Sequence, residues 1–282
     1  MPVISTLKTW FRRNQRELPW RDDVTPWEVV LSEFMLQQTQ VSRVIPYFEK
    51  FRSTFPTPSA MAKTPKSKVL EMWGGLGYPR RALRLHELAT VLVKDFDNQV
   101  PEDYETLISL PGIGDYTANA ILAFAFQKRS VVIDTNIRRV ISRAVLGHEW
   151  PTKSITKTER EQIESLVPRQ HKAASMYSAA IMELGQVICV PKPKCDLCPI
   201  KRECKWVLAG KPVGVKVNRT QAWHGTNRKC RGIILRAIRE ENSVTINSLS
   251  KSWANREQLE SCVEALIEEG FIEKSDRKLI LA

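Results

Sequence analysis

The cysteines of this chain are gathered near residue 200, and their spacing constrains the fold more than any other feature. Four of the six follow the pattern Cys189-x5-Cys195-x2-Cys198-x5-Cys204, and none precedes Cys189. Clustered cysteines in a chain without secretion signals indicate metal binding rather than disulfides. Four thiolates at this spacing can ligate one tetrahedral zinc ion or one [4Fe–4S] cluster, and spacing alone does not distinguish the two.

The chain is strongly basic, with a net charge of +12 over 282 residues. Such a balance is typical of proteins that bind a polyanion, most often nucleic acid, although a basic protein without such a partner is the alternative. No apolar run reaches about 18 residues and no signal peptide is evident, so we expect a cytoplasmic protein with no membrane association. The predicted metal loop suits a phosphate backbone, because it contains Lys192, Lys194, Lys201, Arg202 and Lys205.

Apolar residues recur at helical spacing along most of the chain, and no alternating strand pattern precedes residue 205. The body is therefore predicted to be all-α, and its length allows two domains with a small additional module. One helix is expected to start at Thr25-Pro26, where threonine is placed as N-cap and proline in the first turn. The other helices are predicted over residues 2–16, 40–53, 57–63, 66–73, 80–95, 102–109, 115–126, 135–146, 158–166 and 172–188.

The last third of the chain changes character. No acidic residue occurs from Lys205 to Arg239, and residues 207–227 have the composition of a basic linker. Beyond them, residues 228–282 are predicted to form a small winged-helix-like module. Its elements are three short helices over 232–239, 246–253 and 256–269 and a strand pair over 270–273 and 278–281. Such modules bind DNA or protein, and a structural use is equally open.

A glycine-rich turn lies between two predicted helices, in Leu110-Pro111-Gly112-Ile113-Gly114. Glycine lets backbone N–H groups approach a ligand closely, and the following helix presents its positive end in the same direction. The turn is also compatible with a tight connector of no functional importance. In a basic chain with a basic metal loop, a grip on phosphate is the better interpretation.

Two carboxylates, Glu33 and Asp134, lie in apolar surroundings. Cleavage of a glycosidic bond needs an acid for the leaving group and an anion that stabilises an oxocarbenium-like sugar, and a glutamate in an apolar pocket keeps its proton to higher pH. The structural alternatives are a helix N-cap for Asp134 and an ion pair with Arg21 for Glu33. Two loops contain polar, aromatic and basic side chains that are suited to wedging into a DNA duplex. The alternative is that the tyrosine and leucine are core residues and the arginines are solvated. These residues are Gln37, Gln38, Leu76, Tyr78, Arg80, Arg81 and Arg84.

Together these residues resemble the helix-hairpin-helix DNA glycosylases, and most closely the adenine DNA glycosylases of the MutY type. The resemblance covers residues 5–206 and implies a six-helix barrel domain with the hairpin over 24–127. It also implies that residues 1–23 and 128–206 form a second domain, in which Cys189, Cys195, Cys198 and Cys204 hold a structural [4Fe–4S] cluster. The matching strings, in the family's order, are Leu18–Arg21, Ser32–Val41, Gly75–Tyr78, Leu110–Gly114, Asp134–Val140 and the four cysteines.

The resemblance implies a base-excision-repair hydrolase. An adenine mispaired with 8-oxoguanine or guanine is flipped out of double-stranded DNA, Glu33 protonates it at N7, Asp134 stabilises the oxocarbenium-like sugar, and water completes hydrolysis of the N-glycosidic bond. The base pocket includes Trp20 and Arg21. Further residues expected to contact DNA are Gln37, Gln38, Thr39, Leu76, Tyr78, Gly112 and Gly114. The resemblance also implies a monomer in the bacterial cytoplasm, associated with the nucleoid.

Tyr116 distinguishes subfamilies. Relatives of the endonuclease III type have at this position a lysine whose amine attacks the sugar and cuts the strand, and a phenol cannot form that Schiff base. A monofunctional glycosylase is therefore expected. Tyr116 also occurs in thymine glycosylases that act on T:G mismatches, which is the alternative function; the string Gln37-Gln38-Thr39 favours adenine. A non-enzymatic regulator with a redox cluster and a winged helix is a third hypothesis, and it requires both carboxylates to be dispensable.

Two departures from the family pattern concern the cluster and the C-terminus. The first cysteine gap is five residues where the family usually has six, which affects the expected local geometry of the loop. Longer adenine glycosylases have a Nudix-like C-terminal domain that checks for 8-oxoguanine, and residues 228–282 are too short for one. Discrimination between 8-oxoguanine and guanine is therefore expected to be weaker, or to depend on the catalytic body alone.

Overall fold

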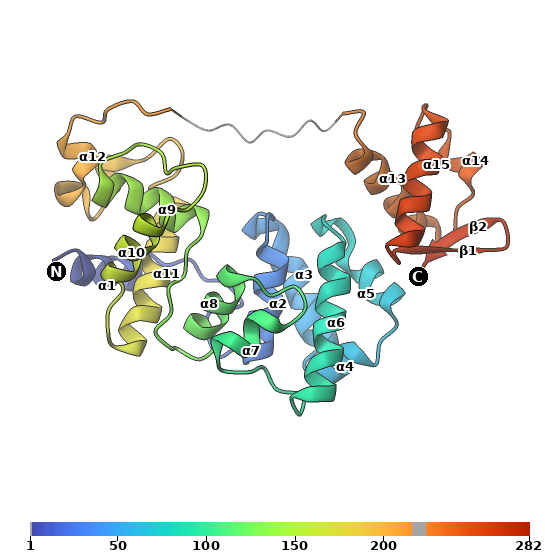
Figure 1. Ribbon diagram of the computed structural model, residues 1–282, viewed down its shortest axis with the longest axis horizontal. Coiled ribbons are helices and arrows are strands. Elements are labelled where there is room, and N and C mark those ends of the chain that lie inside the picture. Colours follow the sequence, from blue (N-terminus) through green and yellow to red (C-terminus); the bar gives the residue numbers. More distant parts are fainter. Residues whose placement is uncertain (1, 216–223) are drawn as a thin grey trace. The chain divides into compact units, whose positions relative to one another are not determined.

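The computed structural model describes residues 2–215 and 224–282, and over these ranges the chain is predominantly helical (Figure 1). The predicted all-α body is confirmed, since the first strand of the described ranges begins at Ile272. Residues 216–223 of the predicted linker lie outside the described residues. No helix in the described ranges combines the length and apolarity needed to cross a membrane.

The structure divides into two compact units. The first unit comprises Met1–Val29, Pro101–Ser109 and Ile113–Arg219. Its elements are α1 (Pro2–Asn14), the first turn of α2 (Pro26–Leu36), α7 (Tyr104–Ser109), α8 (Asp115–Phe124), α9 (Thr135–Ile141), the π turn η2 (Ser142–Leu146), α10 (Lys157–Leu166), α11 (His171–Val187), the 3-10 turns η3 (Cys195–Leu197) and η4 (Lys201–Glu203), and α12 (Lys205–Leu208).

Helix α11 is the centre of the first unit and contacts α1, α8 and α9. Its apolar side chains meet those of the neighbouring helices in one core that includes Leu7, Ile137, Ile181 and Leu184. Helix α11 also carries Glu183 among these apolar side chains. The Glu183 side chain is 1% exposed, and its carboxylate oxygens form ion pairs with the guanidinium nitrogens of Arg16 at 2.7 Å and of Arg21 at 2.6 Å. A buried carboxylate is tolerated where cations and hydrogen bonds surround it, so these contacts fix residues 16–21 on α11.

The second unit comprises Val30–Val100, Leu110–Gly112 and Thr220–Ala282. Its described elements are the remainder of α2, α3 (Val41–Thr54), α4 (Pro58–Ala62), α5 (Lys66–Trp73), the 3-10 turn η1 (Gly74–Leu76), α6 (Arg80–Asp95), α13 (Asn227–Glu241), α14 (Ile246–Leu249), α15 (Arg256–Glu268), β1 (Ile272–Ser275) and β2 (Lys278–Leu281).

Large apolar side chains fill the helical part of the second unit. Phe51 of α3 meets Trp73 of α5 edge to face, with ring centroids 5.8 Å apart. Helix α6 contacts α4 and α5 and buries Leu85 and Leu88 completely. The structure starts α5 and α6 at Lys66 and Arg80 and ends them at Trp73 and Asp95, which are the predicted bounds.

The C-terminal module (the described residues 224–282) contains the predicted three helices and strand pair. Thr226 caps α13 by accepting a hydrogen bond from the N–H of Lys229, so this helix begins five residues earlier than predicted. Helices α13 and α15 pack together, and β1 and β2 pair antiparallel with Ile272 opposite Leu281 (Figure 1). Its classification as a winged helix stays a prediction.

Two further differences from the sequence predictions concern boundaries. The predicted helix over 135–146 is α9 followed by a π turn, Ser142–Leu146. The change of helical spacing coincides with Arg143, whose buried guanidinium donates hydrogen bonds to carbonyls of the cysteine loop, and π turns are often found where a helix serves a site. The compact units also divide the chain at other points than the predicted domains do, and that domain division stays a prediction.

Candidate functional site

Glu33 lies on α2, a helix whose first turn is set by local polar contacts. The Thr25 hydroxyl accepts a hydrogen bond from the N–H of Glu28 at 3.2 Å, and the Glu28 carboxylate accepts one from the N–H of Thr25 at 2.7 Å. This reciprocal arrangement satisfies N–H groups at the first turn and starts the helix. Glu33 follows on the buried face and is 5% exposed, next to the fully buried Leu31 and Met35. Sequence reasoning therefore placed this carboxyl group correctly among apolar side chains.

Asp134 is the N-cap of α9 and belongs to the first unit. One carboxylate oxygen accepts a hydrogen bond from the N–H of Ile137 and the other from the side-chain amide of Asn136, both at 2.6 Å. Burial raises the pKa of the Asp134 carboxyl, and these hydrogen bonds only partly counteract the effect. The N-cap interpretation is thus correct, and it leaves a catalytic use open because capping holds the carboxylate in one orientation.

Two buried arginines connect α9 with the cysteine loop. The Arg139 guanidinium donates to the side-chain oxygen of Asn136 and to the carbonyls of Gly185 and Cys189, each at 2.7 Å. Arg143 donates to the carbonyl of Val190 at 2.8 Å and lies 3.5 Å from the Cys189 sulfur. The backbone that enters the loop is therefore held by the helix that Asp134 caps and by the π turn that directly follows this helix.

Gly185 explains how close α9 and α11 come. A Cβ atom at this position would lie 2.8 Å from the Cβ of Asn136, a distance that real structures essentially never show. Only glycine allows this approach, which brings the Gly185 carbonyl within reach of Arg139. Sequence reasoning missed Arg139, Arg143 and Gly185, because arginine is ordinarily a surface residue and glycine on α11 carries no local signal.

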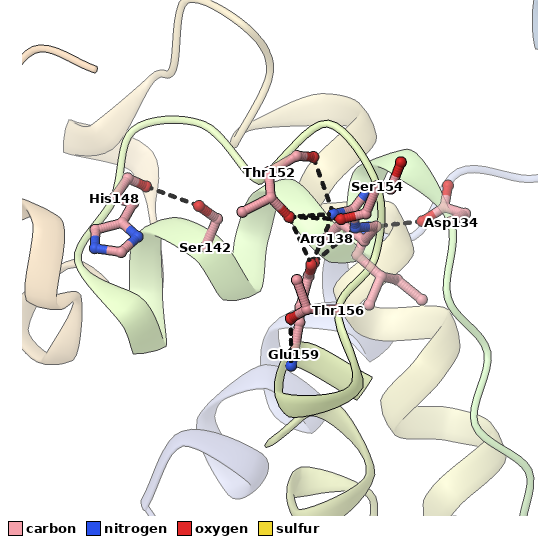
Figure 2. Close-up of polar contacts among 9 residues, drawn as sticks. Asp134, Arg138, Ser142, His148, Thr152, Ser154, Thr156 and Glu159 are labelled. Atoms are coloured by element: carbon pink, nitrogen blue, oxygen red, sulfur yellow. Dashed lines mark hydrogen bonds and ion pairs between the residues drawn. The ribbon is translucent and has the colours of Figure 1, made fainter. Parts of the chain in front are cut away.

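A second polar cluster holds the outer side of α9 (Figure 2). Arg138 donates to both carboxylate oxygens of Glu159, at 2.6 and 2.7 Å, and also to Thr152. Thr156 caps α10, the helix that carries Glu159, by accepting a hydrogen bond from the Glu159 N–H. A bidentate pair of this kind is geometrically specific, so it fixes the segment between α9 and α10 and supports the helix on which Asp134 sits.

The four predicted metal ligands, Cys189, Cys195, Cys198 and Cys204, line one cavity with about 370 Å³ of empty space, part of it open to solvent. Apolar side chains such as Leu184 and Ile200 form its walls. In the described part of the chain, no three Cys, His, Asp or Glu side chains converge as they would around a single metal ion. Burial raises the pKa of the Cys198 thiol to about 11 and also raises the pKa of Cys204, so the thiols need a cation to become thiolates.

The glycine hairpin contains two glycines with different surroundings. Gly112 has φ +78°, and a Cβ atom there would lie 2.8 Å from the Phe34 ring. Gly114 has an extended backbone, with φ −105° and ψ 178°, and no atom would lie within 4 Å of its Cβ. Local folding therefore demands glycine at position 112, whereas it accepts any small residue at position 114.

The helix after the hairpin is held by Asp115. This carboxylate accepts hydrogen bonds from the Tyr104 hydroxyl at 2.8 Å and from Arg160 at 2.7 Å. Burial alone would raise the pKa of Asp115, but these two donors hold it below its ordinary value. Tyr116, next along α8, is partly buried against the core of the first unit. Sequence reasoning noted Tyr116 and missed the network around Asp115.

Arg81 joins the two loops that are predicted to contact DNA. It is 8% exposed, and its guanidinium donates to the carbonyls of Phe34 and Met35 at the end of α2. It also donates to the Thr39 hydroxyl at 2.9 Å and to the carbonyls of Leu76 and Gly77 at 3.2 and 2.9 Å. Burial lowers its pKa to about 10, which leaves it charged at neutral pH. The expectation of a duplex-facing Arg81 is wrong, because its donors face inward.

Several predicted DNA contacts lie on these loops. Thr39 donates to the carbonyl of Leu76 at 3.1 Å, and both Gln38 and Tyr78 have positive φ angles, 57° and 48°. Leu76 is 2% exposed, so its predicted wedging needs a rearrangement of the loop, whereas Gln37 and Tyr78 are half-buried. The strained backbone of these loops is a feature that functional loops often carry.

Trp20 and Arg21 belong to the first unit. Arg21 donates to the carboxylate of Glu183 at 2.6 Å and to the carbonyl of Arg16 at 2.8 Å. Within the first unit Arg21 is thus paired with Glu183, and the alternative of an ion pair with Glu33 stays a prediction. Arg21 fixes the segment that presents Trp20, whose side chain is partly exposed.

Comparison with known proteins extends over nearly the whole chain. Residues 31–165 match the family described as HhH-GPD superfamily base excision DNA repair protein. The chain is 41% identical over 281 residues to an adenine DNA glycosylase of Mycolicibacterium smegmatis, which covers 98% of this chain and 94% of that protein. An adenine DNA glycosylase of Mycobacterium tuberculosis is 40% identical over 276 residues, covering 96% and 90%.

Solved structures agree on the fold. A thermostable thymine-DNA glycosylase superposes with a TM-score of 0.67 at 30% identity and covers 74% of this chain and 96% of that one. An endonuclease III in a non-covalent DNA complex has a TM-score of 0.62 at 21% identity, covering 74% and 95%. Both solved structures cover 74% of the present chain, whereas the two mycobacterial relatives cover 98% and 96% of it.

Proposed function

Because the chain belongs to the adenine DNA glycosylases, within the HhH-GPD superfamily of base excision repair proteins, we propose that it hydrolyses the N-glycosidic bond of adenine in DNA. The observation that carries this proposal is the 41% identity over 98% of the chain. The adenine to be removed lies opposite 8-oxoguanine or guanine. The enzyme binds DNA, and we place it as a monomer at the nucleoid in the bacterial cytoplasm.

Glu33 is the proposed general acid. Cleavage requires a proton on N7 of adenine, so that the C1′–N9 bond can break with both electrons passing to the base. The position of Glu33 on the buried face of α2 keeps bulk water away from this proton. Trp20 and Arg21 are proposed to line the pocket for the flipped base, with Arg21 acting through its ion pair with Glu183.

Asp134 is the proposed anion that stabilises the oxocarbenium-like sugar. Its two hydrogen bonds hold the carboxylate in place before the charge develops, which is the arrangement that makes electrostatic stabilisation effective. Water then adds to C1′ and loses its proton, and an abasic sugar and free adenine result. Tyr116 supplies no amine for a Schiff base, so we propose a monofunctional glycosylase that leaves the strand intact.

The four cysteines are proposed to hold a [4Fe–4S] cluster. Four thiols that line one cavity with apolar walls fit a group that binds four thiolates, and zinc stays the minor alternative. The cluster would supply cationic charge that stabilises the thiolates and a rigid support for the loop. The chain's own contribution is the grip of Arg139 and Arg143 on the loop backbone.

We propose that DNA contacts two further segments in addition to the base pocket, the basic cysteine loop and the glycine hairpin. The exposed cations of the cysteine loop suit the phosphate backbone, and the N–H groups after Gly112 and Gly114 suit a single phosphate. The loops joined by Arg81 would meet the base opposite adenine.

Glu33→Gln tests the chemistry. We expect adenine release from an A:8-oxoguanine duplex to fall about 10²- to 10⁴-fold, because the amide cannot donate an acidic proton, while duplex binding persists. Glu49→Gln is the matched control, since Glu49 is an exposed carboxylate on α3 that forms an ion pair with Arg52 one turn away. A Glu33→Gln protein with undiminished adenine release would overturn the assignment.

A further inference from the structure

The C-terminal module packs against the rest of the second unit at the loop that contains Leu76 and Tyr78, which is predicted to contact the base opposite adenine. Helix α13 contacts η1, and strand β2 contacts α5. The 3-10 turn η1 ends at Leu76, and Tyr78 follows two residues later. The module therefore lies next to the residues that the proposed function uses for recognition, although it is separated from them by about 150 positions in the sequence.

Arg228, in the first turn of α13, makes the direct contact with this loop. Its guanidinium donates a hydrogen bond to the Tyr78 hydroxyl at 2.6 Å, and its central carbon lies 4.5 Å from the centre of the Tyr78 ring. A planar guanidinium in this position combines a cation–π contact with a directional hydrogen bond. The two contacts together restrict both the tilt and the rotation of the ring.

A second contact fixes the helix that carries Arg228. Glu269, at the end of α15, accepts hydrogen bonds from Arg231 of α13 at 2.8 and 2.6 Å and from Arg80 of α6 at 2.6 Å. The Arg231 and Arg80 guanidinium groups hold the pKa of Glu269 at about 2, so the carboxylate stays charged across the physiological range. Glu269 thus bridges the module to the first turn of α6, two residues beyond Tyr78.

The backbone of Tyr78 is restrained separately by the helical body. Arg81 donates to the carbonyls of Leu76 and Gly77, immediately before Tyr78, and its guanidinium carbon lies 5.5 Å from the Tyr78 ring centre. Tyr78 itself has a positive φ of 48°, an uncommon conformation for a bulky residue. Body and module therefore both restrain this residue: Arg81 holds the backbone before it and lies near its ring, and Arg228 holds the ring and its hydroxyl.

We propose that the C-terminal module completes the opposite-base recognition site, with Arg228 as the residue that positions the Tyr78 ring against an oxidised purine. The proposal rests on the proposed function, in which Tyr78 contacts 8-oxoguanine. It gives the module a part in specificity. Arg228 acts through Tyr78 and does not touch the reacting atoms, so its loss alters the relative rates of adenine release opposite the two bases and does not abolish release.

The test measures single-turnover adenine release from A:8-oxoguanine and A:G duplexes. Arg228→Ala is expected to lower the ratio of the two rates roughly three- to tenfold, the range that a cation–π contact and one hydrogen bond support. Arg228→Lys keeps the charge but lacks the planar fork and is expected to restore only part of the ratio. Arg256→Ala is the matched control, because it removes the same charge from the same module at an exposed pair with Glu260.

A double-mutant cycle assigns the effect to the pair. Tyr78→Phe keeps the ring and removes the acceptor, so Tyr78→Phe combined with Arg228→Ala should lower the ratio by less than the product of the two single effects. Each variant's melting temperature is compared with that of the wild type, and Arg228→Lys serves as the test if Arg228→Ala does not fold. An unchanged ratio in the Arg228 variants, or strictly multiplicative effects, would overturn the proposal.

Two further outcomes are distinguishable. Faster adenine release or tighter duplex binding by Arg228→Ala would contradict the proposal, because it would mean that the module covers the loop instead of completing it. Wild-type protein that releases no adenine from either duplex would refute the proposed function itself. Duplex affinities in the Glu33→Gln background report the preference for 8-oxoguanine independently of bond cleavage, so the two failures give different results.

Discussion

Replacement of Gly112 by alanine gives the most quantitative prediction of the structure. Gly112 has φ +78°, where an L side chain costs about 1–2 kcal/mol. Its new Cβ would lie 2.8 Å from the Phe34 ring and 3.0 Å from the Cβ of Arg84, and overpacking of this kind costs about 1–3 kcal/mol. The less flexible unfolded chain returns about 0.5–1 kcal/mol. The net destabilisation of Gly112→Ala is therefore about 3 kcal/mol.

Gly114→Ala is the matched control within the same turn. Its extended backbone suits alanine and no atom would contact the added methyl group, so stability should change by less than about 1 kcal/mol. If the hairpin grips a phosphate through its N–H groups, the same methyl group obstructs that approach. Loss of one charge-assisted hydrogen bond then weakens duplex binding by about tenfold.

Both variants are measured by urea unfolding, followed by circular dichroism, and by duplex binding at one fixed salt concentration. A loss of less than about 1 kcal/mol of unfolding free energy in Gly112→Ala would show that the clash and the positive φ at this position are unimportant. The proposed phosphate grip is refuted if Gly114→Ala binds a duplex as tightly as the wild type does.

Three further predictions concern other parts of the molecule. Asp134→Asn keeps an oxygen for the N-cap hydrogen bond from Ile137 but places an amide group opposite the donating Asn136, so stability should fall by about 1–3 kcal/mol. Adenine release should fall by about 10²-fold or more, and unfolding and single-turnover assays on the same preparation measure both effects. Burial would raise the pKa of Glu183, but hydrogen bonds and ion pairs from Arg16 and Arg21 lower it below its ordinary value. The charged Glu183 therefore stabilises the fold fully at pH values above its pKa in the unfolded chain. This stabilisation is lost as the pH falls through the lower pKa of the folded protein. The difference in unfolding free energy between wild type and Glu183→Gln should therefore be largest near pH 7 and shrink in acid; a difference independent of pH would contradict this. Cys198→Ser should reduce the bound iron per chain, detected by metal analysis and thiolate-to-iron absorbance, whereas Cys230→Ser in the C-terminal module should leave it unchanged.

Much of the fold was predictable because its signals are local. Helices α5 and α6 each begin directly after a proline, α5 ends directly before Gly74, and the predicted bounds of both helices agree with the structure. The strand pair of the C-terminal module was also recognisable from its flanking turn residues. Asp134 was correctly expected to cap a helix, since an aspartate ahead of a helical run is a local feature.

The missed features depend on contacts distant in sequence. Arg81, Arg139 and Arg143 are buried and donate to backbone carbonyls some 40–50 positions away, whereas a sequence shows only that they are arginines, which ordinarily lie on the surface. The contact of Arg228 with Tyr78 spans 150 positions and has no local pattern. These arginines determine how the predicted site residues are held, and a sequence pattern alone does not reveal them.

The most direct test of the proposed function is the identity of the base released from matched duplexes containing A:8-oxoguanine, A:G and T:G. Purified full-length protein is incubated with each duplex and the free base is identified by chromatography. The account predicts adenine from the first two duplexes, no thymine from the third, and an intact strand until the abasic site is cleaved with alkali. Release of thymine from T:G without release of adenine would contradict it.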